Sequence, residues 1–420
     1  MPDAFVRRQL LIAALTGNAL RPVPGSWPSI PAMFAGWMAG ELAPHLLAAT
    51  ATDAVSELAR GRRSRPGLAL AAASSAGLVA LIRQSQAAKG DVDRALREAL
   101  GADYMDRLTA VHTDIDLTMP WQQLVMPFRM RDDEVEILKD VAYSEAGKRG
   151  LLDIYRKRDP NRDISQNAVA GRNGAPVLLH VHGGGWTIGD KEHQGIPLML
   201  HMAARGWVCV TINYRLSPRN AFPAHLVDVK RAIAWVREHG HEYGADPSYI
   251  AITGGSAGGH LTALAALTPN DPEYQPGFED ADTRLQVAVP HYGVYDFAAA
   301  SGTKRALQMR DGFLAPRVLQ QDPLTALNEF ERASPLLRVN AEAPPFFVIH
   351  GTHDTLIPVA EARSFVRRLR AVATQPVAYA ELPGTQHAFD VFPSIRSAHV
   401  VRAVDRFLRW NYSAALTRQT

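Results

Sequence analysis

A serine flanked by glycines, at residues 254–258 in the order Gly-Gly-Ser-Ala-Gly, has the context that best suits covalent chemistry. Ser256 follows the apolar run of residues 249–253, which predicts a strand, and precedes a helix-compatible stretch at residues 260–267. In a G-x-S-x-G turn, the glycines let the backbone turn tightly and hold the serine exposed. The N-terminus of the following helix offers unpaired N–H groups to a developing negative charge. This context predicts that Ser256 is a nucleophile, although the pattern alone also occurs in ordinary turns.

A glycine-rich loop upstream supplies the second part of such a site. The apolar residues 176–181 predict a buried strand that runs into His182, three glycines at 183–185 and Trp186. Consecutive glycines let main-chain N–H groups approach the substrate oxygen that becomes negative in the transition state. The alternative, a phosphate-binding loop, lacks an accompanying G-K-[ST] or G-x-G-x-x-G pattern. The loop is therefore interpreted as one side of an oxyanion hole.

An aspartate and a histidine follow two further predicted strands. Asp354 lies just past the apolar strand at residues 346–349, and His387 lies on a turn after the strand at residues 377–382. The chain order serine, aspartate, histidine is that of the α/β hydrolases, and it differs from the orders of the two familiar serine protease groups.

Together these four motifs resemble the hormone-sensitive-lipase-like carboxylesterases and lipases, over roughly residues 135 to 412. The resemblance implies that Ser256 attacks, that His387 takes its proton and that Asp354 orients the imidazole. It also implies an oxyanion hole made by Gly183, Gly184, Gly185 and Ala257. Residues 214–219 match the run that the family carries on a helical stretch, with Arg219 where the family usually has an acid, and Gly255 stands where the family often has aspartate.

Several other residues invite a chemical interpretation. His353 adjoins Asp354, but a sequence neighbour at a strand end points elsewhere, so His387 is preferred as the base. His182 is interpreted as a scaffold of the glycine loop. The histidines at 239 and 241 lie where a helix should end, as the helix dipole favours, and no metal-binding spacing is present. The S-x-x-K match at residues 301–304 lacks its companion Lys-Thr-Gly. We therefore expect neither a metal nor a cofactor.

The predicted fold class is α/β, specifically an α/β-hydrolase fold with a mostly parallel eight-stranded sheet and helices on both faces. An antiparallel edge hairpin is expected from the first two strands, and a helical lid insertion between about residues 294 and 345. The predicted strands are 137–144, 150–157, 176–182, 207–214, 249–255, 285–292, 345–351 and 377–382. The catalytic domain would then cover residues 135–420, preceded by a helical segment at residues 1–134.

Composition agrees with a globular enzyme. The chain has 420 residues, 47% of them hydrophobic, and a net charge of +3, which gives no case for nucleic-acid binding. Its single cysteine, Cys209, lies in an apolar strand and is expected to be buried. A small-molecule acyl ester is the expected partner, and the sequence leaves the oligomeric state open.

The N-terminal segment supports two interpretations, a lid and a membrane-contacting region. Residues 67–82 carry no charge but fall short of the roughly 20 apolar residues of a spanning helix, so a buried or interfacial helix is preferred. Arg7 and Arg8 precede an apolar stretch too short for an export signal. The expected location is cytoplasmic or peripherally membrane-associated. Two sets of side chains are candidates for an acyl pocket or for ordinary core packing: Trp27, Phe34, Trp37, Met38 and Met119, Trp121, Met126, Phe128.

The leading functional hypothesis is a carboxylesterase or lipase that uses an acyl-enzyme on short to medium acyl esters. An amide hydrolase on the same scaffold, such as an arylformamidase or peptidase, remains an alternative because it would use the same groups. A non-catalytic binding protein is the third hypothesis.

Overall fold

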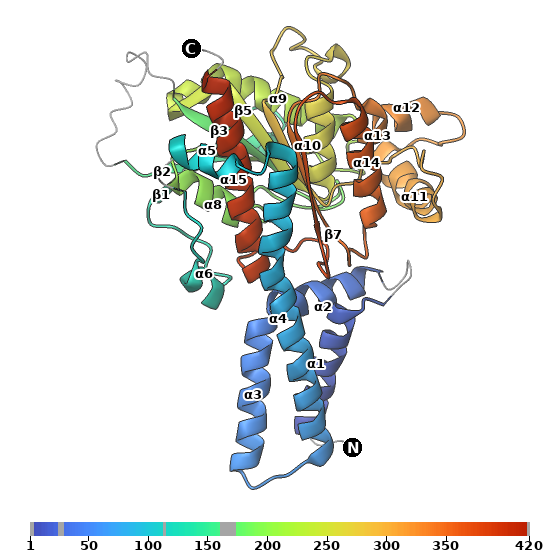
Figure 1. Ribbon diagram of the computed structural model, residues 1–420. Coiled ribbons are helices and arrows are strands. Elements are labelled where there is room, and N and C mark those ends of the chain that lie inside the picture. The colour runs from blue at the N-terminus through green and yellow to red at the C-terminus, as the bar shows by residue number, and fades with distance from the viewer. Residues whose placement is uncertain (1–3, 24–28, 112–114, 160–173, 418–420) are drawn as a thin grey trace.

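The computed structural model describes residues 4–23, 29–111, 115–159 and 174–417, and its centre is one twisted eight-stranded sheet (Figure 1). The strand order is β1-β2-β4-β3-β5-β6-β7-β8. Strand β2 pairs antiparallel with both β1 and β4, and every other pairing is parallel. The predicted mostly parallel sheet with an antiparallel edge hairpin is therefore confirmed.

The strands lie close to their predicted positions. They are β1 Val135–Ala142, β2 Leu151–Lys157, β3 Ala175–Val181, β4 Val208–Ile212, β5 Ala245–Gly255, β6 Val287–His291, β7 Phe346–Gly351 and β8 Val377–Leu382. The central strands read as continuous apolar runs because both faces of the sheet are covered, so every residue of β4, β6 and β7 is buried. Cys209 lies within β4 and is buried, as predicted.

Helices cover both faces of the sheet. On one face pack α9 (Ala224–His239), α10 (Ala257–Leu267) and α14 (Val359–Val372). On the other pack α8 (Ile196–Ala204), α15 (Ile395–Thr417) and the C-terminal half of α4 (Arg65–Leu100). Short 3-10 turns complete the connections: η1 Gly147–Gly150, η2 Gly240–Tyr243 and η3 Pro272–Tyr274. The two apolar layers fix the ends of the central strands, where the candidate site residues lie.

The chain between β6 and β7 forms the predicted helical insertion. It contains α11 (Lys304–Met309), the π-helical segment η4 (Arg310–Leu319), α12 (Leu327–Arg332) and α13 (Pro335–Arg338). Figure 1 shows these helices beside α14, at one side of the sheet.

The N-terminal residues form helices, some of which project from the body of the protein (Figure 1). They are α1 Ala4–Leu20, α2 Ser29–Glu41, α3 Ala43–Ala59, α4 and the short α5 Tyr104–Val111 and α6 Trp121–Val125. Helices α1, α3 and the N-terminal half of α4 form a three-helix projection, which we call the stalk, and α2 lies at its base (Figure 1). The apolar stretch at residues 67–82 belongs to the stalk, and only 28% of the apolar window in α4 is buried. Ala72, Ala73 and Ala76 of this stretch are exposed among the described residues, so a fully buried helix does not describe it, and the interfacial alternative stays a prediction.

A buried ion pair ties α2 to the body. Glu41, at the end of α2, bonds with Arg396 at the start of α15, and the Ser394 hydroxyl donates to the other Glu41 oxygen at 2.6 Å. Both charged side chains are 1% exposed. This ion pair holds α2, at the base of the stalk, against α15. Removing one partner would leave an unpaired buried charge, which is costly in free energy.

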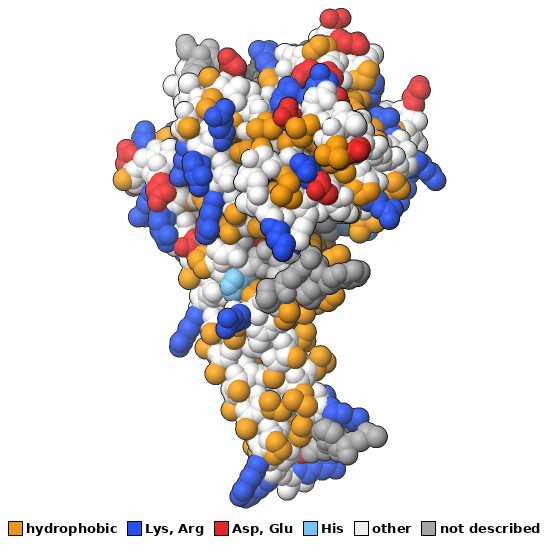
Figure 2. Space-filling model, turned by 90° about the vertical axis from the view of Figure 1, so that its right-hand side faces the viewer, with side chains coloured by type: hydrophobic (Ala, Val, Ile, Leu, Met, Phe, Trp, Pro, Cys, Tyr) orange, Lys and Arg blue, Asp and Glu red, His pale blue; other side chains and the backbone are white. Residues whose placement is uncertain are grey.

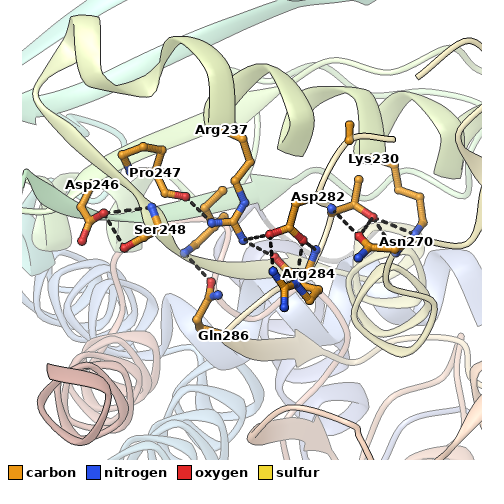
Figure 3. Close-up of polar contacts among 12 residues, drawn as sticks. Lys230, Arg237, Asp246, Pro247, Ser248, Asn270, Asp282, Arg284 and Gln286 are labelled. Atoms are coloured by element: carbon orange, nitrogen blue, oxygen red, sulfur yellow. Dashed lines mark hydrogen bonds and ion pairs between the residues drawn. The ribbon is translucent and has the colours of Figure 1, made fainter. Parts of the chain in front are cut away.

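Polar contacts hold the end of β5 that lies away from the candidate site (Figure 3). Arg237 of α9 donates to the carbonyl oxygens of Arg284, at 2.6 Å, and Pro247. Lys230, two helix turns before Arg237, donates to the carbonyl oxygen of Thr268. Burial lowers the pKa of Lys230 to about 8. These bonds anchor α9 to both loops around β5, whose opposite end carries Ser256.

Candidate active site

Ser256 occupies a strained turn between β5 and α10. Its φ of 60° and ψ of −121° lie in a region that L-residues rarely adopt, as a nucleophile elbow requires. Its backbone N–H donates to the carbonyl of His291 at 3.0 Å, which ties the turn to the end of β6. A Cβ atom at Gly258 would lie 2.8 Å from the His182 carbonyl oxygen, so glycine is required there for close approach of the loop. The structure therefore gives Ser256 the predicted backbone geometry.

Asp354 and His387 form a buried pair. The His387 Nδ1 atom lies 2.6 Å from Asp354 Oδ2, and the Asp354 Oδ1 atom accepts from the backbone N–H groups of Leu356 and Ile357 at 2.9 and 2.8 Å. Burial alone would raise the pKa of Asp354, but His387 and the nearby His350 lower it below its ordinary value. The carboxylate is thus held charged and oriented toward one imidazole nitrogen.

The structure separates His387 from the rival His353. His387 lines the same cavity as Ser256. His353 contacts the backbone carbonyl of Ala19, at 3.3 Å, on the side of the stalk. The preference for His387 over its neighbour in sequence agrees with this arrangement.

The glycine loop contributes two residues to the cavity wall, Gly184 and Gly185. Their φ values of 112° and 59° are accessible to glycine with little strain. Gly183 differs, because its N–H donates to Gln194 Oε1 at 2.7 Å and is not free to bind an oxyanion. Gly183 is therefore better described as a support of the loop, which corrects its inclusion among the oxyanion residues.

His182 lies beneath the loop. Its ring stacks on Tyr214, with centroids 4.3 Å apart, and Tyr214 donates to the His182 carbonyl at 2.9 Å. Burial lowers the pKa of His182 to about 4, so the ring is neutral at pH 7. These contacts agree with a scaffold role. Residues 214–219, which the resemblance placed on a helical stretch, instead form an irregular segment and a turn before α9. The Tyr214 hydroxyl and the Ser217 N–H donate to the carbonyls of His182 and Trp186, so these groups bond to the glycine loop rather than within a helix.

An apolar cavity of about 1390 Å³ joins these residues. Its walls come from the glycine loop, from Ser256 and His387, from α2 and from the insertion, where Phe313 faces Gly185. The lining residues of α2 are Ile30, Met33, Phe34 and Trp37. The cavity exceeds the usual 300–1,000 Å³ or so of ligand pockets, and its apolar lining suits an acyl chain.

The aromatic and methionine residues chosen from the sequence divide into two groups. Phe34 and Trp37 line the cavity, as expected for an acyl pocket. Trp121, Met126 and Phe128 do not line it, and all three are exposed, so neither the pocket nor the core interpretation holds for them. Met38 and Met119 also lie outside the lining, and Trp27 falls outside the described residues.

Four residues around the site were missed in the sequence. Gln194 holds Gly183, and Tyr292 lies against His387 with ring centroids 4.6 Å apart. Asp390 accepts from the Tyr292 hydroxyl and lies 2.6 Å from His291 Nδ1. Two sequence signals could have pointed to these residues: residues 291–292 lie at the end of a predicted strand, and Asp390 is close to His387 in the chain. The contacts themselves form only when the chain folds.

Comparisons with known proteins agree with this site. Residues 163–369 match the family model described as BD-FAE. The chain is 44% identical over 413 residues to the probable carboxylic ester hydrolase LipM of Mycobacterium tuberculosis, covering 96% of this chain and 91% of LipM. It is 47% identical over 269 residues to the esterase LipQ of the same organism, covering 64% of this chain and 61% of LipQ.

Solved structures show the fold. A thermophilic esterase from Thermogutta terrifontis superposes with a TM-score of 0.53 at 23% identity, covering 67% of this chain and 94% of that one. A carbohydrate esterase from gut microbiota gives 0.53 at 21% identity, covering 66% and 98%. The predicted α/β-hydrolase fold is confirmed, and the match to LipM along nearly the whole chain shows the activity class. This chain belongs to the hormone-sensitive-lipase-like carboxylic ester hydrolases and is an enzyme that cleaves ester bonds.

Proposed function

We propose that the chain hydrolyses esters of short to medium acyl chains through an acyl-enzyme on Ser256. His387 takes the proton of the Ser256 hydroxyl as Oγ attacks the ester carbonyl, and it then protonates the leaving alcohol. Water, deprotonated by the same imidazole, attacks the acyl-enzyme and releases the acid. Asp354 keeps His387 in the tautomer that accepts on Nε2 and stabilises its charged form.

The carbonyl oxygen that becomes negative would bind to main-chain N–H groups of Gly184, Gly185 and Ala257. Loss of one such donor typically costs about 3 kcal/mol of transition-state stabilisation, so this loop matters as much as the acid. Gln194 would act through Gly183, by holding the glycine loop in the position from which its N–H groups can bind the oxyanion.

The observation that carries the proposal is the shared cavity of Ser256 and His387, with Asp354 bonded to the far side of the imidazole. A nucleophile, a base and an orienting acid in that order are what acyl transfer requires. The apolar lining supports an acyl chain, rather than a charged group, as the part of the substrate that fills the cavity.

We also propose a division of labour along the chain. Residues 135–420 would form the catalytic domain, and the insertion near residues 294–345 would serve as a lid together with α2 from the N-terminal segment. One observation supports this division: residues of α2 and of η4 line the same cavity as the glycine loop.

Kinetics with p-nitrophenyl esters of two to twelve carbons test the proposal, with an aryl formamide and an aminopeptidase substrate beside them. We expect ester hydrolysis that Ser256→Ala abolishes, with an unchanged circular dichroism spectrum, and a burst of p-nitrophenol equal to the enzyme concentration. A folded Ser256→Ala protein with full activity would overturn the mechanism. Faster cleavage of the formamide than of every ester would overturn the substrate class.

A further inference from the structure

The stalk buries a small apolar seam around Leu78 and Leu81, but polar side chains share its interior and many apolar side chains face outward. Polar groups lie inside it: Gln9 and Thr50 are fully buried, and Thr16, Ser74 and Glu57 are almost so. Apolar side chains face outward instead, including Leu11 at 61% exposed and Val55 at 65% exposed. A bundle in water buries its apolar stripe, so this arrangement indicates an apolar surrounding for the stalk.

The outward apolar surface belongs to all three helices. It comprises Leu10, Leu11, Ala14 and Leu20 of α1, Ala48, Ala49, Ala51 and Val55 of α3, and Ala69, Ala72, Ala73, Ala76 and Ala80 of α4. Figure 2 shows hydrophobic side chains along the stalk, with basic side chains gathered at its far end. A stalk lying flat on a membrane surface would leave the apolar side chains of some of its helices in water. Immersion covers all of them.

Contacts inside the stalk are those of helices that pack in lipid. A Cβ atom at Gly77 of α4 would lie 2.6 Å from Thr16 of α1, so the two helices approach at a small residue. The Thr16 and Thr50 hydroxyls donate to backbone carbonyls of their own helices, at 2.8 and 2.7 Å, and are thus satisfied without water.

Charges mark both ends of an uncharged band. Residues 9–20, 43–52 and 66–82 contain no Asp, Glu, Lys or Arg. Arginines flank the band at the far end, at positions 7, 8, 60, 62, 63 and 65, and at the base, at positions 21 and 83. The carboxylate of Asp53 lies toward the far end and pairs with Arg8 at 2.6 Å. From Arg65 to Arg83 the helix rises about 27 Å, close to the roughly 30 Å of bilayer hydrocarbon.

Three exposed aromatic side chains belong to α2 and to the segment that includes α6. Trp121 and Phe128 are 65% and 66% exposed, and Phe34 is 52% exposed. The segment that carries Trp121 is held to the start of α3 by His45, whose Nε2 lies 3.2 Å from the Val125 carbonyl. Tryptophan and other aromatic rings gather at the headgroup level of membranes, so exposed aromatic side chains near the base suit that level.

We propose that the stalk spans a phospholipid bilayer, with the arginines of the α3–α4 turn among the far headgroups and the catalytic body at the near surface. Arginine suits this place because anionic headgroups attract it and its long side chain reaches them. The cavity wall formed by α2 would then lie at the membrane surface, where apolar esters accumulate. The placement of the stalk is independent of the catalytic mechanism proposed above.

Single-cysteine labelling tests the placement, because the native Cys209 is fully buried. Ala14→Cys, Ala51→Cys and Ala72→Cys place an environment-sensitive dye at mid-stalk, and Leu324→Cys, 88% exposed on the body, is the control. In vesicles of phosphatidylcholine and phosphatidylglycerol, we expect a blue-shifted emission at mid-stalk, quenched most by lipids with a spin label near the bilayer centre. Water-like emission at all three positions would overturn the proposal. Blue-shifted emission that the spin-labelled lipids do not quench would also overturn it, because a second copy of the chain would then cover the stalk.

Sidedness tests the span itself. The variants Arg62→Cys at the stalk tip and Leu324→Cys on the body are each inserted into sealed vesicles in one orientation. An impermeant maleimide added outside should label only one of the two variants, and both only after the vesicles are opened. Labelling of both from one side would show a shallow stalk and overturn the span.

A charge substitution gives an independent readout. Leu11→Asp with Val55→Asp should lower the fraction that floats with vesicles after carbonate washing at least tenfold, because a carboxylate in hydrocarbon is costly. Leu324→Asp should leave flotation unchanged. The wild-type chain, the stalk variant and Leu324→Asp should cleave a water-soluble ester at equal rates. A failure of the proposed catalytic mechanism would therefore appear separately. Equal flotation of the stalk variant and the control would contradict the proposal.

Discussion

The phenol ring of Tyr292 lies against the imidazole of His387, with ring centroids 4.6 Å apart, while its hydroxyl bonds to Asp390. Tyr292 also lies beneath the nucleophile turn, since a Cβ atom at Gly255 would lie 2.6 Å from its hydroxyl oxygen. One side chain therefore contacts both the turn that carries Ser256 and the proposed base.

This contact predicts a positioning role for Tyr292. Tyr292→Phe keeps the ring but leaves the buried Asp390 with one partner fewer, so we expect kcat to fall about tenfold with little change in KM. Tyr292→Ala should lose more, because His387 loses a wall of its site. Stopped-flow measurement of acylation checks this, and equal losses in the two variants would rule out a role for the ring.

Asp354→Asn should lower kcat/KM by about ten-thousand-fold, as in other triads, because the amide favours the wrong histidine tautomer. The matched control is Asp390→Asn, which changes another aspartate that bonds to a histidine, His291. We expect a much smaller loss there. A wild-type rate for Asp354→Asn beside an inactive Asp390→Asn would reverse the assignment of the acid.

The wall that α2 gives to the cavity predicts a change in acyl preference. Phe34→Ala removes apolar contact with the distal part of the chain, so the ratio of kcat/KM for octanoyl over acetyl esters should fall about tenfold. Phe128→Ala is the matched control, since Phe128 is exposed near α2 but does not line the cavity. An unchanged ratio in Phe34→Ala would remove α2 from the acyl pocket.

Glu361 predicts how stability depends on pH. Burial, opposed in part by N–H donation from Tyr295 and with a further contribution from Asp296, raises its pKa to about 7 from an ordinary value of 4.5. Between these values the folded state binds more protons than the unfolded state, so the free energy of unfolding should fall as pH rises through this window. The full difference corresponds to about 3 kcal/mol.

Urea unfolding at pH 5 and pH 8 measures this effect. Glu361→Gln keeps an oxygen that can accept from Tyr295 but cannot ionise, so it should be less sensitive to pH than the wild-type chain. Parallel pH profiles for the two proteins would contradict the assignment.

The ion pair between Glu41 and Arg396 predicts the stability of the docked α2. Arg396→Met leaves a buried carboxylate without its cation and should destabilise the protein by about 3–5 kcal/mol. The double change Glu41→Gln and Arg396→Met should recover part of that loss, because no charge then remains buried. Unfolding midpoints and protease cleavage near α2 provide the measurements, and additive losses would show that the two residues do not interact.

The sequence by itself determined the sheet and the order of the candidate residues. Ser256, Asp354 and His387 each follow an apolar run that became a strand, and such runs are readable because both faces of the sheet are buried. The glycines at 184, 185 and 258 were equally visible, since positive φ or close backbone approach leaves glycine little alternative.

Only the tertiary structure decided which groups support these residues. The contacts of Tyr292 with His387 and of Glu41 with Arg396 join side chains far apart in the chain, and the Gly183 N–H meets Gln194 across a loop. No local pattern records such pairs. The surroundings of the stalk helices are open in the sequence for a related reason. A run of alanine and leucine is the same in a protein core and in a lipid-facing helix, and the difference lies in which side chains the neighbouring helices cover.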